Sequence, residues 1–245
     1  MIEFLNFGVR YGELLVLKDV DLSVPKNEVL AILGASGSGK STLLRSIAGF
    51  ERRYTGQILV EGIALSEYLI SNRPAVVFQR FSNFPWLRVK ENVMVPIKYG
   101  HATDTAERQV DELIREMGLE NSEEKFMREL SGGMQQRVAV ARALMQGSDV
   151  LLMDEPFGAL DVKNRTAIQS LLKAALIRRP RTVVFVTHDV EEALFVSDRV
   201  VLISNSGIDT AGSITGFRHD MDHRVKYSNP FVEKRMTLEV LLKRT

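Results

Sequence analysis

The sequence predicts an α/β fold with a mostly helical segment inserted into it. Four apolar runs predict buried strands, at residues 29–33, 75–78, 150–153 and 182–186. Their apolarity is continuous rather than alternating, which is typical of strands covered on both faces in a parallel or mixed sheet. A glycine-rich segment follows the first run and leads into an apolar helix, and helical periodicity separates the later runs. This order of elements favours an α/β core.

Composition bounds the class of protein. The chain has 245 residues, enough to bury a sizeable core. Its 45% hydrophobic and 26% charged residues are ordinary for a soluble globular protein. The net charge of +1 comes from scattered residues, so the sequence predicts no nucleic-acid partner. Because the chain has no cysteine, disulfides, thiolate metal ligands and cysteine nucleophiles are excluded.

Neither a targeting signal nor a membrane span is predicted. The first residues lack a basic segment followed by a long apolar core, so they do not indicate a signal peptide. No stretch reaches the roughly 18 to 20 apolar residues that a membrane-spanning helix needs. We therefore expect a cytoplasmic chain whose role at any membrane depends on a partner.

The inserted helical segment is predicted at residues 85–147. A capping-box pattern of Asp104 and Glu107 opens one helix, and Gly118 stands where that helix would end. A second helix is expected at 132–145. The apolar residues of the first helix fall on one face: Val110, Leu113, Ile114 and Met117.

The rest of the chain divides around this insertion. Residues 1–84 and 148–205 are predicted to form the α/β core, and 206–245 a short C-terminal segment with a helix at about 230–242. His219, Asp220, Asp222 and His223 in this last segment have the residue types of metal ligands. We expect them instead to belong to a solvated polar tail, since charged residues near a chain end are commonly solvated.

A phosphate-binding loop is predicted between the strand at 29–33 and the next helix. Glycines let the backbone adopt positive φ and turn N–H groups toward phosphate oxygens, and the helix N-terminus adds the positive end of its dipole. Lys40 is predicted to bridge the β- and γ-phosphates of ATP, and Ser41 to coordinate Mg²⁺. The P-loop pattern and the residue after it supply the nucleotide contacts: Gly34, Ala35, Ser36, Gly37, Ser38, Gly39, Lys40, Ser41 and Thr42.

A later apolar strand ends in two carboxylates, Asp154 and Glu155. Asp154 is predicted to hold the Mg²⁺ shell, and Glu155 to polarise the attacking water as general base. By itself a strand that ends in Asp-Glu is more often a solvated strand end. The P-loop lacks the carboxylate that this strand supplies, which favours the catalytic interpretation.

The segment that reads Leu130-Ser131-Gly132-Gly133-Met134-Gln135-Gln136-Arg137 precedes this strand and opens a helix. A serine and two glycines at a helix N-terminus make a second anion site. Together with the P-loop and Asp154-Glu155, this segment resembles the signature motif of ABC ATPases. The resemblance implies a P-loop ATPase core of ABC type and a head-to-tail dimer. In that dimer the signature residues face ATP held by the other subunit: Ser131, Gly132, Gly133 and Gln135.

Other positions match this family in order along residues 2 to 205. Gln79 matches the Q-loop glutamine that senses Mg²⁺ and the attacking water, and His188 matches the switch histidine at the γ-phosphate. Tyr11 matches the aromatic residue that stacks on adenine, and Val16 is an expected apolar contact of the nucleotide. Asp161 matches the D-loop and is an expected dimer contact, although it is equally an N-cap for the helix that follows.

The loop after Gln79 narrows the resemblance. It contains the pattern Pro85-Trp86-x-x-Val89-x-Glu91-Asn92-Val93, which resembles the importers of nitrate, sulfonates, taurine and related small solutes. This implies membrane permease subunits as partners, an extracytoplasmic solute-binding protein acting through them, and a position on the inner face of the cell membrane. An exporting or mechanotransmitting complex and a soluble ABC regulator are the alternatives. Arg80 departs from the acidic or amide residue that such importers often have there.

Trp86 has two interpretations. With Phe84 and Pro85 it could form an apolar socket for a short helix of a partner. The alternative is that its ring packs into the helical segment.

Overall fold

The computed structural model describes residues 1–79, 83–98, 106–158, 160–204 and 207–243. Its core is a six-stranded sheet in the order β10-β9-β3-β8-β7-β6, parallel except for β10, which runs antiparallel to β9. The four predicted strands are confirmed within this sheet. The strands are β3 (Val29–Leu33), β6 (Ala75–Val77), β7 (Val150–Asp154), β8 (Thr182–Thr187), β9 (Arg199–Ser204) and β10 (Gly207–Thr215).

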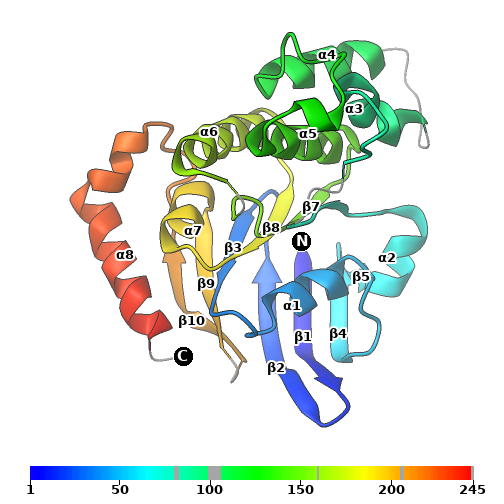
Figure 1. Ribbon diagram of the computed structural model, residues 1–245. Coiled ribbons are helices and arrows are strands. Elements are labelled where there is room, and N and C mark those ends of the chain that lie inside the picture. The colour runs from blue at the N-terminus through cyan, green and yellow to red at the C-terminus, as the bar shows by residue number, and fades with distance from the viewer. Residues whose placement is uncertain (80–82, 99–105, 159, 205–206, 244–245) are drawn as a thin grey trace.

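Both faces of this sheet are covered, as the continuous apolar runs predict. Along β3, Val29, Ala31 and Leu33 belong to one apolar cluster, whereas Leu30 and Ile32 belong to another. Successive side chains of a strand point to opposite faces, so alternate residues of β3 pack into the two layers. Figure 1 shows the two layers, with α5 (Gly132–Met145) and α6 (Val162–Arg178) above the sheet and α1 (Lys40–Ile47) below it.

A second, antiparallel sheet in the order β2-β1-β4-β5 was not predicted. Its strands are β1 (Ile2–Tyr11), β2 (Leu14–Val24), β4 (Thr55–Val60) and β5 (Ile63–Ala64), and α2 (Leu65–Ser71) follows them. The alternation of apolar and polar residues that would reveal β1 is broken between Phe4 and Phe7, where the register with β2 shifts. Asn6, inside that shift, has a φ of 48°. An inserted residue moves the following side chains to the other face, so period two is lost.

The helical segment contains α3 (Val89–Lys98), α4 (Ala106–Glu116), a 3₁₀ turn at Met127–Glu129 and α5. The four apolar residues expected on one face of α4 are all buried. Gly118 has a φ of +61°, which confirms it as the residue that ends this helix. Asp104 of the expected capping box lies outside the described residues.

The C-terminal segment packs against the core rather than extending from it. Figure 1 shows α8 (Asn229–Leu242) along the outer side of α7 (Val190–Val196), and Phe231 and Leu238 of α8 are fully buried. The expectation of a solvated polar tail is wrong for His223, which opens a 3₁₀ turn (His223–Tyr227) and shares a hydrogen bond with Ser170. Its ring packs at a tilt against that of Phe195, with the two ring centroids 4.5 Å apart. Burial accordingly lowers the pKa of His223.

Two absences can be stated for the described part of the chain. None of its helices is long and apolar enough to cross a membrane. No group of three or more histidine or acidic side chains within these ranges is placed to hold a metal ion.

Candidate active site

The predicted phosphate-binding loop connects β3 to α1. Gly37 and Gly39 have φ values of +84° and +92°, a region that glycine enters without steric cost. Gly39 is the residue before the first turn of α1, and a Cβ on it would lie 2.7 Å from the side chain of Leu17. The loop therefore needs glycine here both for its backbone conformation and for its close approach to β2.

Two polar groups of this loop fit a phosphate. The ammonium group of Lys40 is turned back onto the loop, where it donates to the carbonyl oxygens of Gly34 at 2.8 Å and Ala35 at 2.6 Å. Its burial lowers the pKa of Lys40. The hydroxyl of Ser38 is buried without a hydrogen-bond partner among the described residues. A buried donor without a partner and a buried cation on neutral carbonyls would both gain from an anion.

Ser41 and Asp154 meet at the base of the loop. The hydroxyl of Ser41 donates to Oδ1 of Asp154 at 2.9 Å, although the two residues are 113 positions apart. Burial raises the pKa of the Asp154 carboxyl, and the hydrogen bond from Ser41 opposes that shift. A hydroxyl and a carboxylate are hard oxygen ligands of the kind that Mg²⁺ prefers. The pair therefore fits the predicted metal site.

Glu155 stands between the two residues expected to sense the γ-phosphate. Its Oε2 accepts a hydrogen bond from Nε2 of Gln79 at 2.8 Å, and its Oε1 lies 3.3 Å from Nδ1 of His188. The backbone of Glu155 has a φ of 44°, an uncommon conformation for a residue with a side chain. Its N–H donates to the carbonyl of Val186 at 3.0 Å, which fixes the turn to the end of β8.

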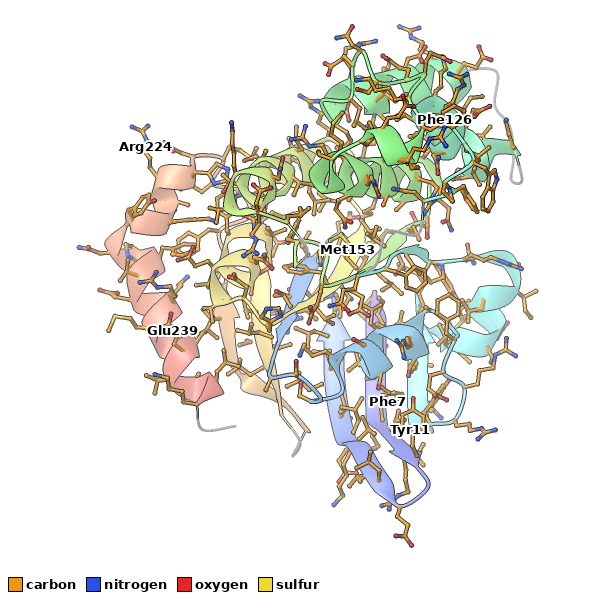
Figure 2. All side chains as sticks on the ribbon, in the orientation of Figure 1. Phe7, Tyr11, Phe126, Met153, Arg224 and Glu239 are labelled. Carbon is orange, nitrogen blue, oxygen red and sulfur yellow. The ribbon has the colours of Figure 1, made fainter. Side chains whose placement is uncertain are left out.

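Sheet order explains why residues so distant in sequence converge. The P-loop follows β3, His188 follows β8, Glu155 follows β7, and Gln79 follows β6 after one residue. These four strands are parallel neighbours. Their carboxyl ends lie along one edge of the sheet, where open α/β folds bind their ligands. In Figure 2, Met153 of β7 marks this strand in the middle of the molecule.

Tyr11 and Val16 lie beside the loop on the antiparallel sheet. Tyr11 ends β1, is 44% exposed, and donates its hydroxyl proton to Glu51 at 2.6 Å. Figure 2 shows Tyr11 beyond Phe7, toward the hairpin between β1 and β2. Val16 is half-buried, and a Cβ on Gly39 would lie 3.2 Å from its side chain. Val16 therefore lies against the P-loop, and the contacts of both residues with a base remain predictions.

The predicted signature residues open α5. The hydroxyl of Ser131 accepts a hydrogen bond from the N–H of Met134 at 3.3 Å, which confirms it as the N-cap. Gly132 is exposed, whereas Gly133 is buried against Asn164 of α6, whose side chain a Cβ would meet at 2.8 Å. The amide of Gln135 donates to the carbonyl oxygens of Met127 and Leu130, so it supports the turn before the helix. Contacts of these residues with ATP in a dimer remain predictions.

Asp161 is an N-cap in this structure. Its carboxylate accepts from the backbone N–H of Asn164 at 3.1 Å and from the side-chain amide of the same residue at 2.6 Å. These bonds lower the pKa of Asp161. The structural half of the interpretation is thus confirmed, and the dimer contact stays a prediction. Arg80 and Ala159 lie outside the described residues.

Known proteins share this arrangement. The sequence profile described as ABC transporter matches residues 17–158, which include the P-loop, the signature segment and Asp154-Glu155. The chain belongs to the ABC transporter family. This membership confirms the resemblance drawn from the motifs, and the ABC ATPase fold of the solved relatives confirms the predicted fold class.

Individual relatives agree with this assignment. The aliphatic sulfonates import ATP-binding protein SsuB 1 of Rhodococcus jostii is 45% identical over 207 residues, 84% of this chain and 80% of that protein. The sulfate/thiosulfate import ATP-binding protein CysA of Synechocystis is 41% identical over 85% of this chain and 59% of its own length. Among solved structures, the ATP-binding cassette MJ0796, a dimer in a post-hydrolysis state bound to ADP and Pi, matches with a TM-score of 0.74 and 31% identity, covering 88% of this chain and 98% of its own.

Sequence reasoning missed a buried network behind His188. The carboxylate of Glu192 in α7 accepts a hydrogen bond from Thr187 at 2.7 Å and lies 3.4 Å from Nε of Arg165. The hydroxyl of Thr187 in turn accepts from the N–H of Asp189 at 3.1 Å. The bonds therefore fix the backbone on both sides of His188. The signal available in the sequence was an acidic residue about one helical turn after His188, beside the apolar residues Ala193, Leu194 and Phe195.

Glu192 predicts a pH dependence of stability. Burial raises its pKa to about 7 and outweighs the attraction of Arg165. Between about pH 4.5 and 7 the folded state holds a proton on Glu192 that the unfolded chain releases. Proton binding therefore stabilises the folded state at low pH, and this contribution to the free energy of unfolding is lost as pH rises through about 7. We expect the stability of Glu192→Gln, measured relative to wild type by urea unfolding, to increase by about 1–3 kcal/mol between pH 5.5 and 8. If the stability difference between Glu192→Gln and wild type stayed the same from about pH 5.5 to 8, the raised pKa of Glu192 would be contradicted. Glu120→Gln, at an exposed position, is the matched control.

Proposed function

We propose that this chain is the ATP-binding and ATP-hydrolysing subunit of an ABC importer for a small solute, and that it works as an ATP-driven head-to-tail dimer. One observation carries the chemistry. Lys40, the Ser41–Asp154 pair and the Glu155 carboxylate lie together at the carboxyl edge of the parallel sheet. Relatives named as import ATP-binding proteins, 38–45% identical to the chain, support the transport role.

The residues of the site divide the reaction between them. Lys40 and the loop N–H groups hold the phosphates, while Glu155 takes a proton from the attacking water as general base. Gln79 and His188, each beside one oxygen of that carboxylate, orient it and report on the γ-phosphate. Mg²⁺, held by Ser41 and Asp154 with Gln79 nearby, would neutralise phosphate charge.

A dimer would complete the site. Ser131 and Gly132 form an exposed helix N-terminus in a chain that already holds a phosphate loop elsewhere. In the proposed dimer this N-terminus, with Gly133 and Gln135 behind it, faces the γ-phosphate on the partner subunit. ATP then favours the closed dimer because only there do both sites contact the same phosphate. The proposed division of the chain is a core of residues 1–84 and 148–205, a helical segment at 85–147 and a short C-terminal segment at 206–245.

The proposed permease contact lies in a groove between the core and the helical segment. The groove has a volume of about 930 Å³, and its lining combines apolar residues with polar and charged ones. The apolar residues include Ile70, Phe78, Phe84 and Ile97, and the polar and charged ones include Arg73, Gln146 and Asp149. Trp86 is 69% exposed and lies 5.6 Å from Phe84. The alternative in which Trp86 packs into the helical segment is therefore wrong. A groove with apolar and polar walls, and an exposed tryptophan packed on Phe84 of its lining, suits a short amphipathic helix.

The solute class rests on the relatives. Their names specify aliphatic sulfonates, sulfate or thiosulfate, and spermidine or putrescine. We propose a nitrate-, sulfonate- or taurine-like solute, because relatives named as aliphatic sulfonates import proteins are 38–45% identical to the chain. The permease and a solute-binding protein acting through it are then the partners, and the chain is peripheral on the inner face of the membrane.

Co-purification in detergent tests the transporter assignment. Tagged Glu155→Gln protein, with ATP, should bring down an integral membrane protein in equal stoichiometry. We expect Ile70→Glu on that background to lose this partner while the ATP-dependent dimer persists, because Ile70 is 81% exposed and lines the groove. Ile177→Glu, a 42% exposed isoleucine on α6, should keep it.

Other results would decide between the alternatives. An exporter-type membrane partner would replace the importer with an exporting or mechanotransmitting complex. A dimer that brings down only soluble protein would favour a soluble ABC regulator. Retention of the membrane partner by Ile70→Glu would place the contact outside the groove.

A further inference from the structure

Tyr11 is bound through its hydroxyl to a residue that the proposed mechanism does not use. Its phenol donates to Oε2 of Glu51 at 2.6 Å, across 40 positions of sequence. The bond raises the pKa of Tyr11 and lowers that of Glu51. The phenol therefore stays a donor, and the carboxylate stays an acceptor, through the neutral range.

Glu51 is itself fixed to the end of α1. Its second oxygen, Oε1, accepts from the N–H of Arg53 at 2.7 Å. Its own N–H donates to the carbonyl of Arg45 in α1 at 3.2 Å, which also accepts from Phe50 at 2.9 Å. Gly49, with a φ of +76°, lets the chain turn there. The carboxylate therefore has a fixed place relative to α1, whose first residue is Lys40.

These contacts connect the two halves of a nucleotide site. The aromatic ring that ends β1 is linked through Glu51 to the helix that begins at the phosphate loop. An exposed tyrosine without this bond would be less firmly oriented and would lose more conformational freedom on binding. Ordering one such side chain costs about 0.5–1.5 kcal/mol, which corresponds to a two- to tenfold change in affinity.

We propose that Glu51 is a positioning residue for Tyr11: it sets the orientation of the phenol ring for stacking on adenine, at a fixed distance from the phosphate loop. This inference rests on the proposed function, because it needs ATP as the ligand. If Glu51 acts in this way, its loss should weaken the binding of the base and leave the binding of the phosphates unchanged. A loop-stabilising role alone would instead act through α1 and weaken both.

Calorimetric or competition binding of Mg·ATP and Mg·tripolyphosphate tests this separation. We expect Glu51→Ala to weaken ATP two- to tenfold and to leave tripolyphosphate within about twofold. Tyr11→Phe keeps the ring but loses the bond, so it should match Glu51→Ala. The Tyr11→Phe/Glu51→Ala double variant should bind ATP no more weakly than the weaker of the two single variants, because both single changes remove the same Tyr11–Glu51 bond. Glu51→Gln keeps an acceptor and should recover most of the affinity.

Three results would overturn the inference. They are wild-type ATP affinity in Tyr11→Phe, an equal loss for both ligands in Glu51→Ala, and additive losses in the double variant. If wild-type protein bound tripolyphosphate but gained nothing from the base, both Tyr11 and Glu51 would be excluded from the site. Failure of wild-type protein to bind either ligand would instead overturn the proposed function, and this inference with it. Glu120→Ala, an exposed carboxylate on the helical segment, is the control.

Discussion

Glu155→Gln should abolish turnover while ATP stays bound. Glutamine keeps the size of the side chain and an oxygen that can accept from Gln79, which now lies 2.8 Å from the carboxylate. It cannot take a proton from water, and general-base catalysis is worth about 10²- to 10⁴-fold in rate. We expect phosphate release to fall by that factor with ATP affinity within about threefold of wild type.

The same variant should accumulate as a dimer in ATP, because hydrolysis is the step that reopens it. Size-exclusion chromatography with light scattering, with and without ATP, measures this directly. Glu120→Gln, an exposed glutamate on the helical segment, should turn over normally and remain monomeric after ATP is consumed. Turnover of Glu155→Gln near the wild-type rate would remove Glu155 as the base and leave its bonds to Gln79 and His188 as structural.

The parallel half of the fold was predictable because its signal is local. Strands such as β3 and β7 are buried on both faces, so their apolar runs are continuous and need no partner to be recognised. β3 is followed by Gly34 of the P-loop, and β7 ends at the metal-site residue Asp154. These motifs located the site without knowledge of the strand order. The pairing of Ser41 with Asp154 then followed from function, and the structure places the two oxygens 2.9 Å apart.

The antiparallel half was less predictable because its regularity depends on long-range pairing. The register shifts in β1 break its alternation, and no local rule reveals that a residue near Asn6 is accommodated by bulging against β2. The Glu51 bond to Tyr11 was missed for a related reason. It joins β1 to the end of α1, and nothing in either segment indicates the other.

The C-terminal segment shows a third limit, since polar composition alone suggested solvation. Lys173, fully buried in α6, donates to the carbonyl oxygens of Phe217 and Asp220, and its ammonium lies 3.4 Å from the ring centroid of Phe195. A cation over an aromatic face is favourable when desolvated. Lysine and histidine here are therefore part of the packing, which residue type by itself does not reveal.

Lys40→Ala should remove tight nucleotide binding, whereas the free protein should remain folded. The ammonium of Lys40 now donates to two loop carbonyls and, with ATP, would exchange them for phosphate oxygens. Truncating one partner of a buried charged pair costs about 2–5 kcal/mol, so we expect ATP affinity to fall at least about 30-fold.

Thermal unfolding separates this loss of binding from a loss of folding. Ligand at 100 times its Kd stabilises a protein by about 2.7 kcal/mol, which corresponds to roughly 5–10 °C in Tm for a chain of this size. Wild-type protein should show that rise with Mg·ATP, and Lys125→Ala, at an exposed lysine, should show it too. At the same ATP concentration Lys40→Ala should show at most about a third of that rise, because a site weakened about 30-fold is only partly stabilised by the ligand. It should still unfold cooperatively, because burial lowers the pKa of Lys40 and the free protein gains little from this charge. A full rise in Lys40→Ala would contradict the P-loop assignment.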